Sequence, residues 1–371
     1  MDFIYLDFKA AFVSVVHSKL LHKLKLFGLT GNLIHWIESF LTDRVFAVKV
    51  GNCYSDWSPV ISGLPQGSVL GPLLFIMLIN ALTECCFNDS CKIFVFADDA
   101  KCFSRIKSYQ DCEILQSTLT AVEHWSNNWQ LPLSLTKCKV LSFLGRNAHI
   151  NYPYAILNSV LPFVDNITDL GVILSSDLSF SRHIDKLCCK ARSRSAMILK
   201  SFQSRDYVLL FRAFVVYVKP ILEYCCNVWS PYKASDIKKI ESVQRLFTKR
   251  LLGLKDLPSP HRLKRVNGES LEMRRIKCDL SMYFKILYDL VDISPDSLFH
   301  VRNVRTRNNG LTLYKEKFNN NLERYVFRNR CLNVWNLLPQ NVVCSNDLAS
   351  FIYNLNSLDL VSIIRKASVS A

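Results

Sequence analysis

Hydrophobic and polar residues along the first 180 positions follow the periods of short strands and amphipathic helices. Strands are predicted at residues 3–6, 45–50, 93–96, from 102 onward and at 140–144. Helices are predicted at residues 20–27, 32–41, 70–85 and 110–130. The spacing within the second helix places on one face Leu33, Trp36, Ile37 and Phe40. This order of elements is typical of an α+β domain in which helices pack on one face of an antiparallel sheet.

Beyond about residue 180 the pattern becomes helical. One apolar face is marked by Ile184, Leu187, Cys188, Ala191, Ile198, Leu199 and Phe202. Basic residues recur at every fourth position of the same helix, at Arg182, Lys186, Lys190 and Arg194. Because four steps of about 100° overshoot one turn by about 40°, these side chains form a slanting stripe on the outer face. A similar helix is predicted at 236–252, and it ends at Gly253.

The stretch 254–267 interrupts this helical pattern with Pro258, Pro260 and several basic residues. We take it as the boundary to a C-terminal helical segment. The chain is therefore predicted to have three parts, at residues 1–180, 181–257 and 258–371.

The composition excludes a disordered chain. Half of the 371 residues are hydrophobic and 12% are aromatic, which is enough apolar surface to offset the entropy lost on folding. Positive charge is concentrated in one segment. Residues 1–180 contain 13 Lys and Arg against 15 Asp and Glu, whereas residues 181–265 contain 19 against 6. A compact basic segment favours a polyanionic partner, most often nucleic acid, over a generally basic surface.

Fourteen cysteines form no recognisable disulfide or zinc pattern. Several are adjacent pairs inside apolar stretches, where Cys packs as a small hydrophobe, and no Cys-x-x-Cys pair occurs. The apolar runs at 69–82 and 207–229 are too short, or interrupted by charges, to span a bilayer. Asp2 and the lack of a basic n-region argue against a signal peptide. We expect a soluble protein of a reducing compartment, not secreted and with no membrane partner.

Three acidic residues end predicted strands. Asp7 follows the first strand, and Asp98 and Asp99 follow the strand at 93–96. An isolated Asp pair is usually a solvated hairpin tip. If the two strands are neighbours, however, the three carboxylates converge on one edge of the sheet and repel one another unless divalent cations bind. Two Mg²⁺ ions held in this way are the apparatus of in-line phosphoryl or nucleotidyl transfer.

Residues 62–68 read Ser-Gly-Leu-Pro-Gln-Gly-Ser, just before an apolar helix. Two glycines around a Pro-Gln pair make a rigid loop whose backbone a base or sugar can approach, although an ordinary helix-entry turn has the same composition. Phe12 comes five residues after Asp7. It could pack beneath a nucleotide sugar or be a core aromatic residue.

Three motifs occur in order: Leu-Asp-Phe-Lys-Ala-Ala-Phe at 6–12, Gly-Leu-Pro-Gln-Gly-Ser-Val-Leu-Gly-Pro at 63–72 and Phe-Ala-Asp-Asp at 96–99. With them the sequence resembles the reverse transcriptases of non-LTR retrotransposons of the LINE type, nearest the Jockey and CR1 groups. The resemblance continues through later motifs at 125–126, 137–139, 169–172, 183–184, 222–224, 229–232 and 335–339. It implies a polymerase palm, a helical thumb and a C-terminal extension. The implied reaction is RNA-directed DNA synthesis from deoxynucleoside triphosphates, with an RNA template, a DNA primer and Mg²⁺.

The resemblance also implies roles at the catalytic centre. Asp7 and Asp98 would share the two Mg²⁺ ions, and Asp99 would complete the carboxylate cluster. Lys137 lies in the segment that can protonate the leaving pyrophosphate.

Other matched positions would contact nucleotides and nucleic acid. Phe12 takes the position of a steric gate that rejects a 2′-hydroxyl, and Gln66 and Gly67 would contact the incoming nucleotide and the template base. Residues 169–172 resemble the primer grip. The basic stripe of Arg182, Lys186, Lys190 and Arg194 would hold a duplex backbone without reading its sequence.

Three positions depart from the family pattern. Residues 10–13 read Ala-Ala-Phe-Val where the family has Lys-Ala-Phe-Asp, residues 79–82 read Ile-Asn-Ala-Leu in place of Ile-Asn-Asp-Leu, and Ser134 replaces an Asn. None of these changes removes a metal ligand. The motifs begin at the first catalytic strand, so we expect a fragment without the fingers that clasp the triphosphate and without the upstream endonuclease. Such a fragment should show little or no polymerase activity.

Two alternatives to an active polymerase stay open: a catalytically inactive nucleic-acid-binding remnant of the retrotransposon, and a relic without function. The family leads us to expect the cytoplasm or the nucleus as the cellular location. The sequence carries no prediction of the oligomeric state.

Overall fold

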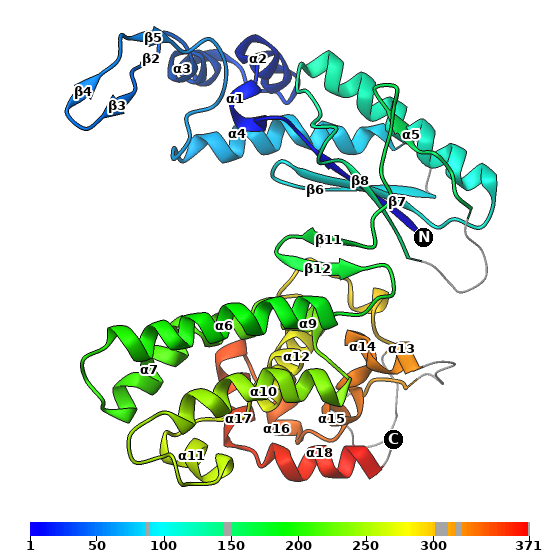
Figure 1. Ribbon diagram of the computed structural model, residues 1–371. Coiled ribbons are helices and arrows are strands. Elements are labelled where there is room, and N and C mark those ends of the chain that lie inside the picture. Colours follow the sequence, from blue (N-terminus) through cyan, green and yellow to red (C-terminus); the bar gives the residue numbers. More distant parts are fainter. Residues whose placement is uncertain (87–89, 144–149, 301–310, 316–320, 370–371) are drawn as a thin grey trace. The chain divides into compact units, whose positions relative to one another are not determined.

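The computed structural model describes residues 1–86, 90–143, 150–300, 311–315 and 321–369 (Figure 1). The chain divides into two compact units, and each is described by itself. The first unit comprises residues 1–169 and 173–179, and the second comprises residues 170–172 and 180–371. The predicted three-part division, with boundaries after residues 180 and 257, stays a prediction.

The first unit is built on a four-stranded antiparallel sheet with the strand order β6-β7-β1-β8 (Figure 1). Its strands are β1 (Asp2–Asp7), β6 (Cys91–Phe96), β7 (Asp99–Ser104) and β8 (Lys139–Ser142). Burial alternates along β1, because successive side chains point to opposite faces: Asp2, Ile4 and Leu6 are buried and the residues between them half-buried. Residue 144, the end of one predicted strand, lies outside the described residues.

Helices of the first unit share one hydrophobic core with the buried face of this sheet. They are α1 (Ala11–Ser14), α2 (His17–Leu26), α3 (Gly31–Leu41), α4 (Leu70–Ile79), the 3₁₀ helix η1 (Asn80–Cys85) and α5 (Tyr109–Trp129). Residues of α4 and α5 join the buried side chains of β1 in one hydrophobic core. α5 begins at a capping box, in which the Ser108 hydroxyl accepts from the Asp111 N–H and the Asp111 carboxylate accepts from the Ser108 N–H. The predicted α+β class is confirmed.

The inward face of α3 differs from the prediction. Its buried residues are Ile34, Ile37 and Leu41, whereas Leu33 and Trp36 are 51% and 55% exposed. Apolar residues form one stripe about 160° wide along this helix, and the core covers only one side of that stripe, so their spacing alone did not identify the buried side.

The predicted strand at 45–50 is broken into two short strands. β2 (Val45–Phe46) pairs with β5 (Ser58–Pro59), and β3 (Lys49–Val50) pairs with β4 (Cys53–Tyr54). Between them, the Val48 N–H donates to the Ser55 hydroxyl at 2.9 Å instead of to another strand. Two further small hairpins are β9–β10 (Ala155–Ile156 with Ser159–Val160) and β11–β12 (Asn166–Asp169 with Val172–Ser175).

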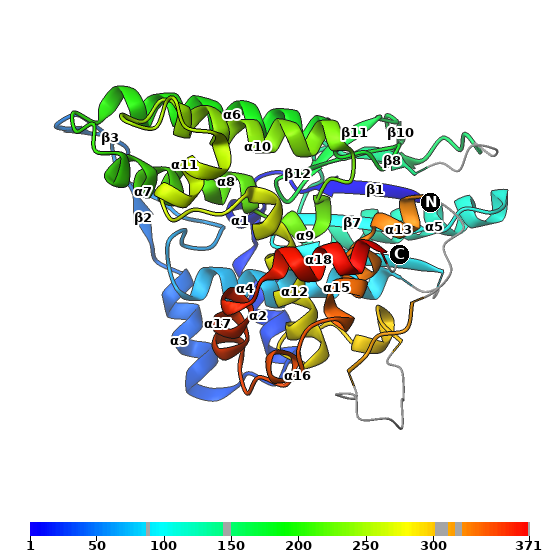
Figure 2. The ribbon, with the colours of Figure 1, turned by 90° about the horizontal axis from the view of Figure 1, so that it is seen from below.

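The second unit is helical. Its helices are α6 (Ser181–Ser201), α7 (Tyr207–Tyr217), α8 (Lys219–Glu223), α9 (Cys226–Trp229), α10 (Ala234–Lys249), α11 (Ser259–Arg265), α12 (Leu271–Leu287), the 3₁₀ helix η2 (Pro295–Ser297), α13 (Asn321–Tyr325), α14 (Phe327–Arg330), α15 (Leu332–Asn336), α16 (Gln340–Val343), α17 (Leu348–Ser357) and α18 (Leu360–Val369). α6 and α10 lie side by side (Figures 1 and 2). Arg330 donates from Nε and Nη2 to the two oxygens of the buried Asp279, both at 2.7 Å, and thereby joins α14 to α12.

The stretch 254–267, predicted as a boundary, contains a helix. α11 starts directly after Pro258 and has Pro260 in its first turn, where a missing N–H costs no intrahelical hydrogen bond. The Arg262 guanidinium is buried and donates to the Thr248 hydroxyl of α10 at 3.2 Å. This stretch is therefore packed against the preceding helix.

All 14 cysteines are free thiols. Across the described ranges, no helix is long and apolar enough to cross a membrane.

Candidate active site

Three acidic residues meet at one end of the central strands. Asp7 lies directly opposite Asp99 in the antiparallel register of β1 and β7, a position in which Cα atoms are about 4.5–5.5 Å apart. Asp98 lies in the tight connection between β6 and β7, where Ala97 has a positive φ of 52°. The sequence separation of about 90 residues is thus closed by strand pairing, as predicted from the motifs.

Lys137 is bound to the first of these carboxylates. Its ammonium group donates to both oxygens of Asp7, at 2.9 and 3.2 Å. The backbone around it is tied to the end of β1, since the Ser134 N–H donates to the Asp7 carbonyl at 2.7 Å. Lys137 is 69% exposed, so solvent screens this ion pair and the pair adds little to stability. The pair can therefore open at little cost.

The crowding of carboxylates affects their protonation. The pKa of Asp99 is raised, first by burial and then by the negative charges of Asp98, Asp7 and Asp169. The pKa of Lys137 is also raised, mainly by its hydrogen bond to Asp7. The site thus holds more negative charge than its own cations compensate.

The chemistry of these side chains fits a hard divalent cation, because carboxylate oxygens are the preferred ligands of Mg²⁺. Their present arrangement is not a closed metal cage. Within the described ranges, no three Asp, Glu, His or Cys side chains converge closely enough to hold an ion. The Asp7 carboxylate is engaged by Lys137 instead. For these carboxylates to hold a cation, Lys137 would have to leave Asp7 and the acidic side chains would have to move closer together.

A second charged cluster, not predicted from the sequence, lies on the same face of the sheet. Lys101 donates to Asp169 Oδ2 at 2.5 Å, and the Tyr5 hydroxyl donates to the same oxygen at 3.3 Å. Tyr5 and Lys101 lie opposite each other on β1 and β7, two residues along the strands from the pair Asp7 and Asp99. The two-residue period of the strand could have identified Lys101, which follows Asp99 on the same face. The cluster fixes the end of β11 beside the acidic residues.

The glycine-rich loop packs against the turn that follows β1. The Gly63 N–H donates to the Val15 carbonyl and the Leu64 N–H donates to the Phe12 carbonyl, both at 2.8 Å. Gly63 has a φ of +86°, and a Cβ there would lie 2.7 Å from the Val13 carbonyl oxygen. Only glycine allows this approach. The loop is therefore held in register with the segment that carries Asp7.

The predicted nucleotide-contacting residues are divided between surface and core. Gln66 and Gly67 are exposed at the tip of the loop. Phe12 is half-buried, stacks on Phe75 at 4.3 Å between ring centroids and packs against the hydrophobic core. This packing agrees with the reading of Phe12 as a core aromatic residue, and its role as a steric gate stays a prediction.

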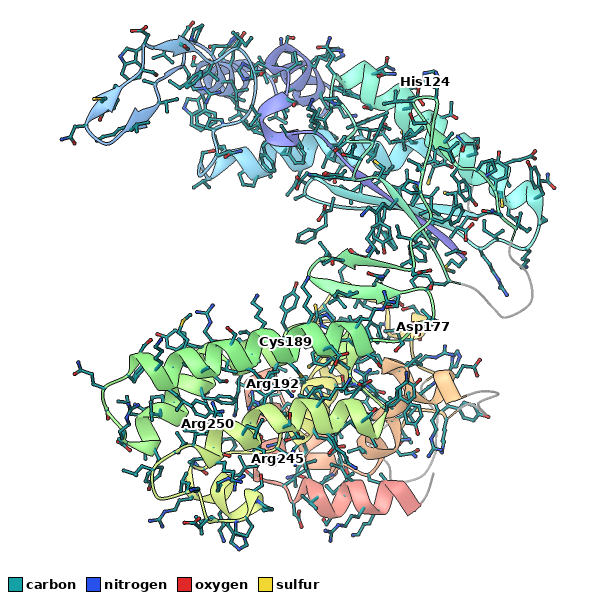
Figure 3. All side chains as sticks on the ribbon, in the orientation of Figure 1. His124, Asp177, Cys189, Arg192, Arg245 and Arg250 are labelled. Carbon is teal, nitrogen blue, oxygen red and sulfur yellow. The ribbon has the colours of Figure 1, made fainter. Side chains whose placement is uncertain are left out.

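In the second unit, the four residues of the basic stripe are all exposed on α6. Three other α6 side chains hydrogen bond to α10, and these pairs are Ser181–Asp236, Asp185–Lys239 and Arg192–Ser242. The stripe therefore lies on a different side of α6 from α10. Arg192 on α6, Arg245 on α10 and Arg250 just after α10, all labelled in Figure 3, add further positive charge.

Residues 169–172, which resemble a primer grip in sequence, span the tip of the β11–β12 hairpin. Within the second unit, the Tyr224 hydroxyl donates to the Leu170 carbonyl at 2.9 Å, and its ring would contact any Cβ added at Gly171. Leu170 and Gly171 both have positive φ angles, of 45° and 85°. Tyr224 of the sequence motif at 222–224 thus stabilises the tip through its hydrogen bond to Leu170.

Comparisons with known proteins agree with these features. Residues 2–174 match the family described as reverse transcriptase (RNA-dependent DNA polymerase). The RNA-directed DNA polymerase from the mobile element jockey of Drosophila funebris is 28% identical over 316 residues, covering 79% of this chain and 32% of that protein. Its counterpart from Drosophila melanogaster is 30% identical over 261 residues, covering 67% and 28%. The chain therefore spans about a third of the length of these relatives.

Among solved structures, a telomerase from Candida albicans in complex with a fragment of telomeric RNA superposes with a TM-score of 0.37 and 13% sequence identity. The superposition covers 79% of this chain and 50% of that one.

Proposed function

We propose that this chain is part of an RNA-directed DNA polymerase, because residues 2–174 match the reverse transcriptase family and the chain is similar to the polymerases of non-LTR retrotransposons. The reaction adds deoxynucleotides from their triphosphates to a primer 3′-hydroxyl opposite an RNA template. In this proposal the first unit is the palm, and the start of the second unit is the thumb. Both nucleic acid strands and the triphosphate are partners.

The observation that carries the proposal is the register of β1 and β7. It sets Asp7 opposite Asp99, with Asp98 in the adjoining turn. A cluster of acidic side chains at the exposed end of a sheet costs stability unless it serves to bind cations. Asp7 and Asp98 would hold two Mg²⁺ ions, and Asp99 would add to their negative field. Bound there, the ions supply charge stabilisation for the transferring phosphoryl group.

Lys137 supplies the proton in this proposal. The carboxylate of Asp7 raises the pKa of Lys137, so the ammonium form persists at neutral pH. When a cation takes its place at Asp7, Lys137 becomes available to the leaving pyrophosphate as a proton donor. The same side chain would thus occupy Asp7 at rest and act as an acid during turnover.

The loop at 62–68 and the basic stripe would position the substrates. Gln66 and Gly67 are free at the loop tip to meet the incoming nucleotide and the template base, and Phe12 would reject a 2′-hydroxyl. The stripe on α6 would contact the duplex backbone. The free cysteines support a reducing location, and the proposed substrates are found in the cytoplasm and the nucleus.

Primer extension tests this function. The chain is mixed in excess with a labelled DNA primer on an RNA template, and addition of the first nucleotide is followed with Mg²⁺ present. Since the resemblance predicts little turnover, single-turnover conditions are needed to measure the rate. We expect slow extension that falls about 10³-fold in Asp98→Ala, because an ion ligand supplies several kcal/mol to the transition state.

The matched control is Asp56→Asn, an exposed acidic residue of the first unit that lies outside the cluster. It should extend at the wild-type rate. Extension that is equal in the wild type and in Asp98→Ala would contradict the assignment of the site.

A further inference from the structure

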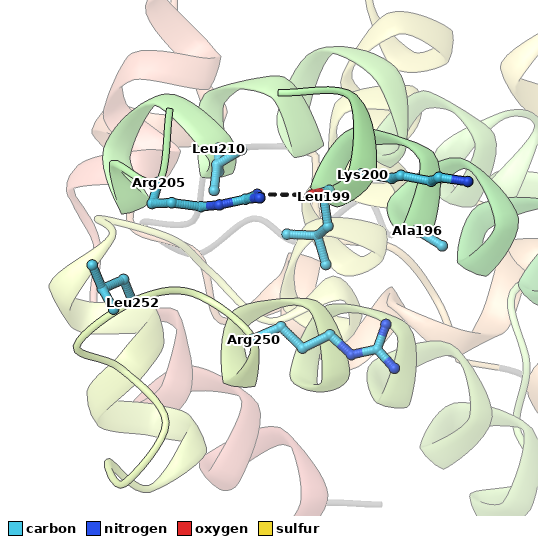
Figure 4. Close-up of a pocket in the computed structure, with 7 residues that line it drawn as sticks. All are labelled: Ala196, Leu199, Lys200, Arg205, Leu210, Arg250 and Leu252. Carbon is cyan, nitrogen blue, oxygen red and sulfur yellow. Dashed lines mark hydrogen bonds between the residues drawn. The ribbon is translucent and has the colours of Figure 1, made fainter. Parts of the chain in front are cut away.

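An open groove of about 580 Å³ lies in the second unit, where α6 and α10 end and α7 begins. Three cationic side chains and four small or apolar ones line it (Figure 4), namely Lys200, Arg205 and Arg250, with Ala196, Leu199, Leu210 and Leu252. None of these described lining residues is acidic. The volume is within the range of small-molecule sites, about 300–1,000 Å³.

Arg205 is held in place by the backbone. Its Nη1 donates to the Leu199 carbonyl at 2.9 Å (Figure 4). The same nitrogen donates to the Phe202 carbonyl at 3.3 Å, at the end of α6. Lys200 and Arg250 are both exposed, and no hydrogen bond or ion pair to another described residue engages them. Two of the three cations are therefore free to bind a ligand, and the third has a fixed position.

The helix dipoles and acidic side chains near the groove do not neutralise these three cations. The C-termini of α6 and α10 each carry a partial charge of about −0.5, and the N-terminus of α7 carries about +0.5. Asp206 lies next to Arg205, but its carboxylate caps α7 by accepting from the Val208 N–H at 2.8 Å. When these charges are included, the groove keeps a surplus of about 1.5 positive charges. A phosphate monoester, with a charge of about −1.5 to −2, matches this surplus better than a singly charged diester.

The apolar side chains give the groove a second property. Leu210 is buried beneath it, whereas Leu252 at its edge is 72% exposed. An exposed leucine beside three cations favours a ligand with both an anionic and a flat apolar part. A nucleotide combines these parts, since its base can lie on leucine side chains while its phosphate reaches the cations.

We propose that this groove binds a nucleotide through a terminal phosphate, either a free nucleoside monophosphate or the 5′-phosphorylated end of a strand. The site lies wholly within the second unit and is separate from the exposed stripe on α6. The proposal does not depend on catalysis by the first unit. A chain that shows no polymerase activity would still bind such a phosphate.

The test compares two single-stranded RNA decamers of one sequence, with a 5′-phosphate or a 5′-hydroxyl, by fluorescence anisotropy with the full chain. We expect the phosphorylated strand to bind about tenfold more tightly, the effect of about one charge-assisted hydrogen bond. The preference should vanish in the double variant Lys200→Ala/Arg250→Ala. The matched control is Lys186→Ala/Lys190→Ala, which removes two exposed charges of the stripe and should weaken both strands equally.

Adenosine 5′-monophosphate and inorganic phosphate serve as competitors and distinguish the sources. If adenosine monophosphate displaces the phosphorylated strand and inorganic phosphate does not, the groove binds both the free nucleotide and the 5′-phosphorylated end. Direct binding of adenosine monophosphate without a preference for the phosphorylated strand supports the free nucleotide as the ligand. Leu252→Ser should weaken the binding of adenosine monophosphate and leave the binding of inorganic phosphate unchanged.

The proposal is overturned if the two decamers bind equally and adenosine monophosphate does not bind. It is also overturned if the preference persists in Lys200→Ala/Arg250→Ala.

Discussion

Asp7 and Asp99 lie directly opposite each other on neighbouring strands, an arrangement that costs stability when both are ionised. Each carboxylate has one cationic neighbour. Lys137 binds Asp7, and the charge of Lys101 partly offsets the upward shift in the pKa of Asp99. Lys101 is itself paired with Asp169. Such an excess of carboxylates over neighbouring cationic side chains is what a cation-binding site requires.

Replacing Asp99 with Asn should stabilise the metal-free protein at neutral pH. Folding raises the pKa of Asp99 above its ordinary value of 3.8, so the ionised carboxylate is less favourable in the folded state. We expect the free energy of unfolding at pH 7 to rise by about 0.2–1 kcal/mol, the usual cost of like charges across strands. The gain should disappear as the pH falls through the raised pKa towards 3.8, because both states then bind the proton. Urea unfolding at several pH values measures it, and a gain that is independent of pH would contradict this account.

At the scale of elements, the glycine-rich loop and the turn after β1 form one unit. Gly63 contacts Val13 so closely that a methyl group would collide with backbone atoms, whereas Gly67 has open space around it. Both glycines have positive φ angles, of +86° and +82°. A comparison of the two glycines can therefore distinguish the cost of a side chain at positive φ, which both share, from the cost of a steric clash, which only Gly63 has.

Gly63→Ala should therefore destabilise the protein more than Gly67→Ala. Each substitution costs about 1–2 kcal/mol for the left-handed backbone. Gly63→Ala should cost about 1–3 kcal/mol more, since its Cβ has to displace the backbone at Val13. Chemical denaturation of both variants gives the difference. Equal losses of stability would show that the loop does not press on the turn.

Much of this element-level picture could be predicted from the sequence. The strand that ends at Asp7 and the strand that precedes Asp98 are visible as short apolar runs, and the order of motifs predicted their convergence. The buried side of α3 could not be predicted, because Leu33 and Trp36 are as apolar as the residues that are buried. The ion pair of Lys101 with Asp169 depends on a contact about 70 residues apart along the chain, which strand periodicity alone does not specify.

At the scale of the whole molecule, charge is divided along the chain. Residues 1–180 are close to neutral, whereas residues 181–371 contain 33 Lys and Arg against 16 Asp and Glu. The acidic cluster lies in the first part and the basic stripe in the second. In the proposed function, the basic part would contact the nucleic acid and the acidic cluster would bind the metal ions.

Binding of an RNA–DNA duplex should depend on salt through the stripe. If Arg182, Lys186, Lys190 and Arg194 each contact a phosphate, replacing all four with Ala should make the log–log salt slope less negative by about 3–4. A matched control replaces four exposed basic residues elsewhere in the second unit, namely Lys238, Lys249, Lys264 and Arg265. Affinity measured from low to moderate salt gives the slopes. If the stripe variant has the same salt slope as the wild type, the four stripe residues do not contact the nucleic acid.

The central claim is that Asp7, Asp98 and Asp99 bind the divalent ions of a nucleotidyl transferase. Titration with Mn²⁺ in place of Mg²⁺, followed by electron paramagnetic resonance, tests it most directly and without any need for turnover. Wild type and Asp56→Asn should bind equally, Asp7→Asn and Asp98→Asn should bind at least about tenfold more weakly, and Lys137→Ala about two- to fivefold more tightly. Wild-type Mn²⁺ affinity in Asp7→Asn and Asp98→Asn would contradict the claim.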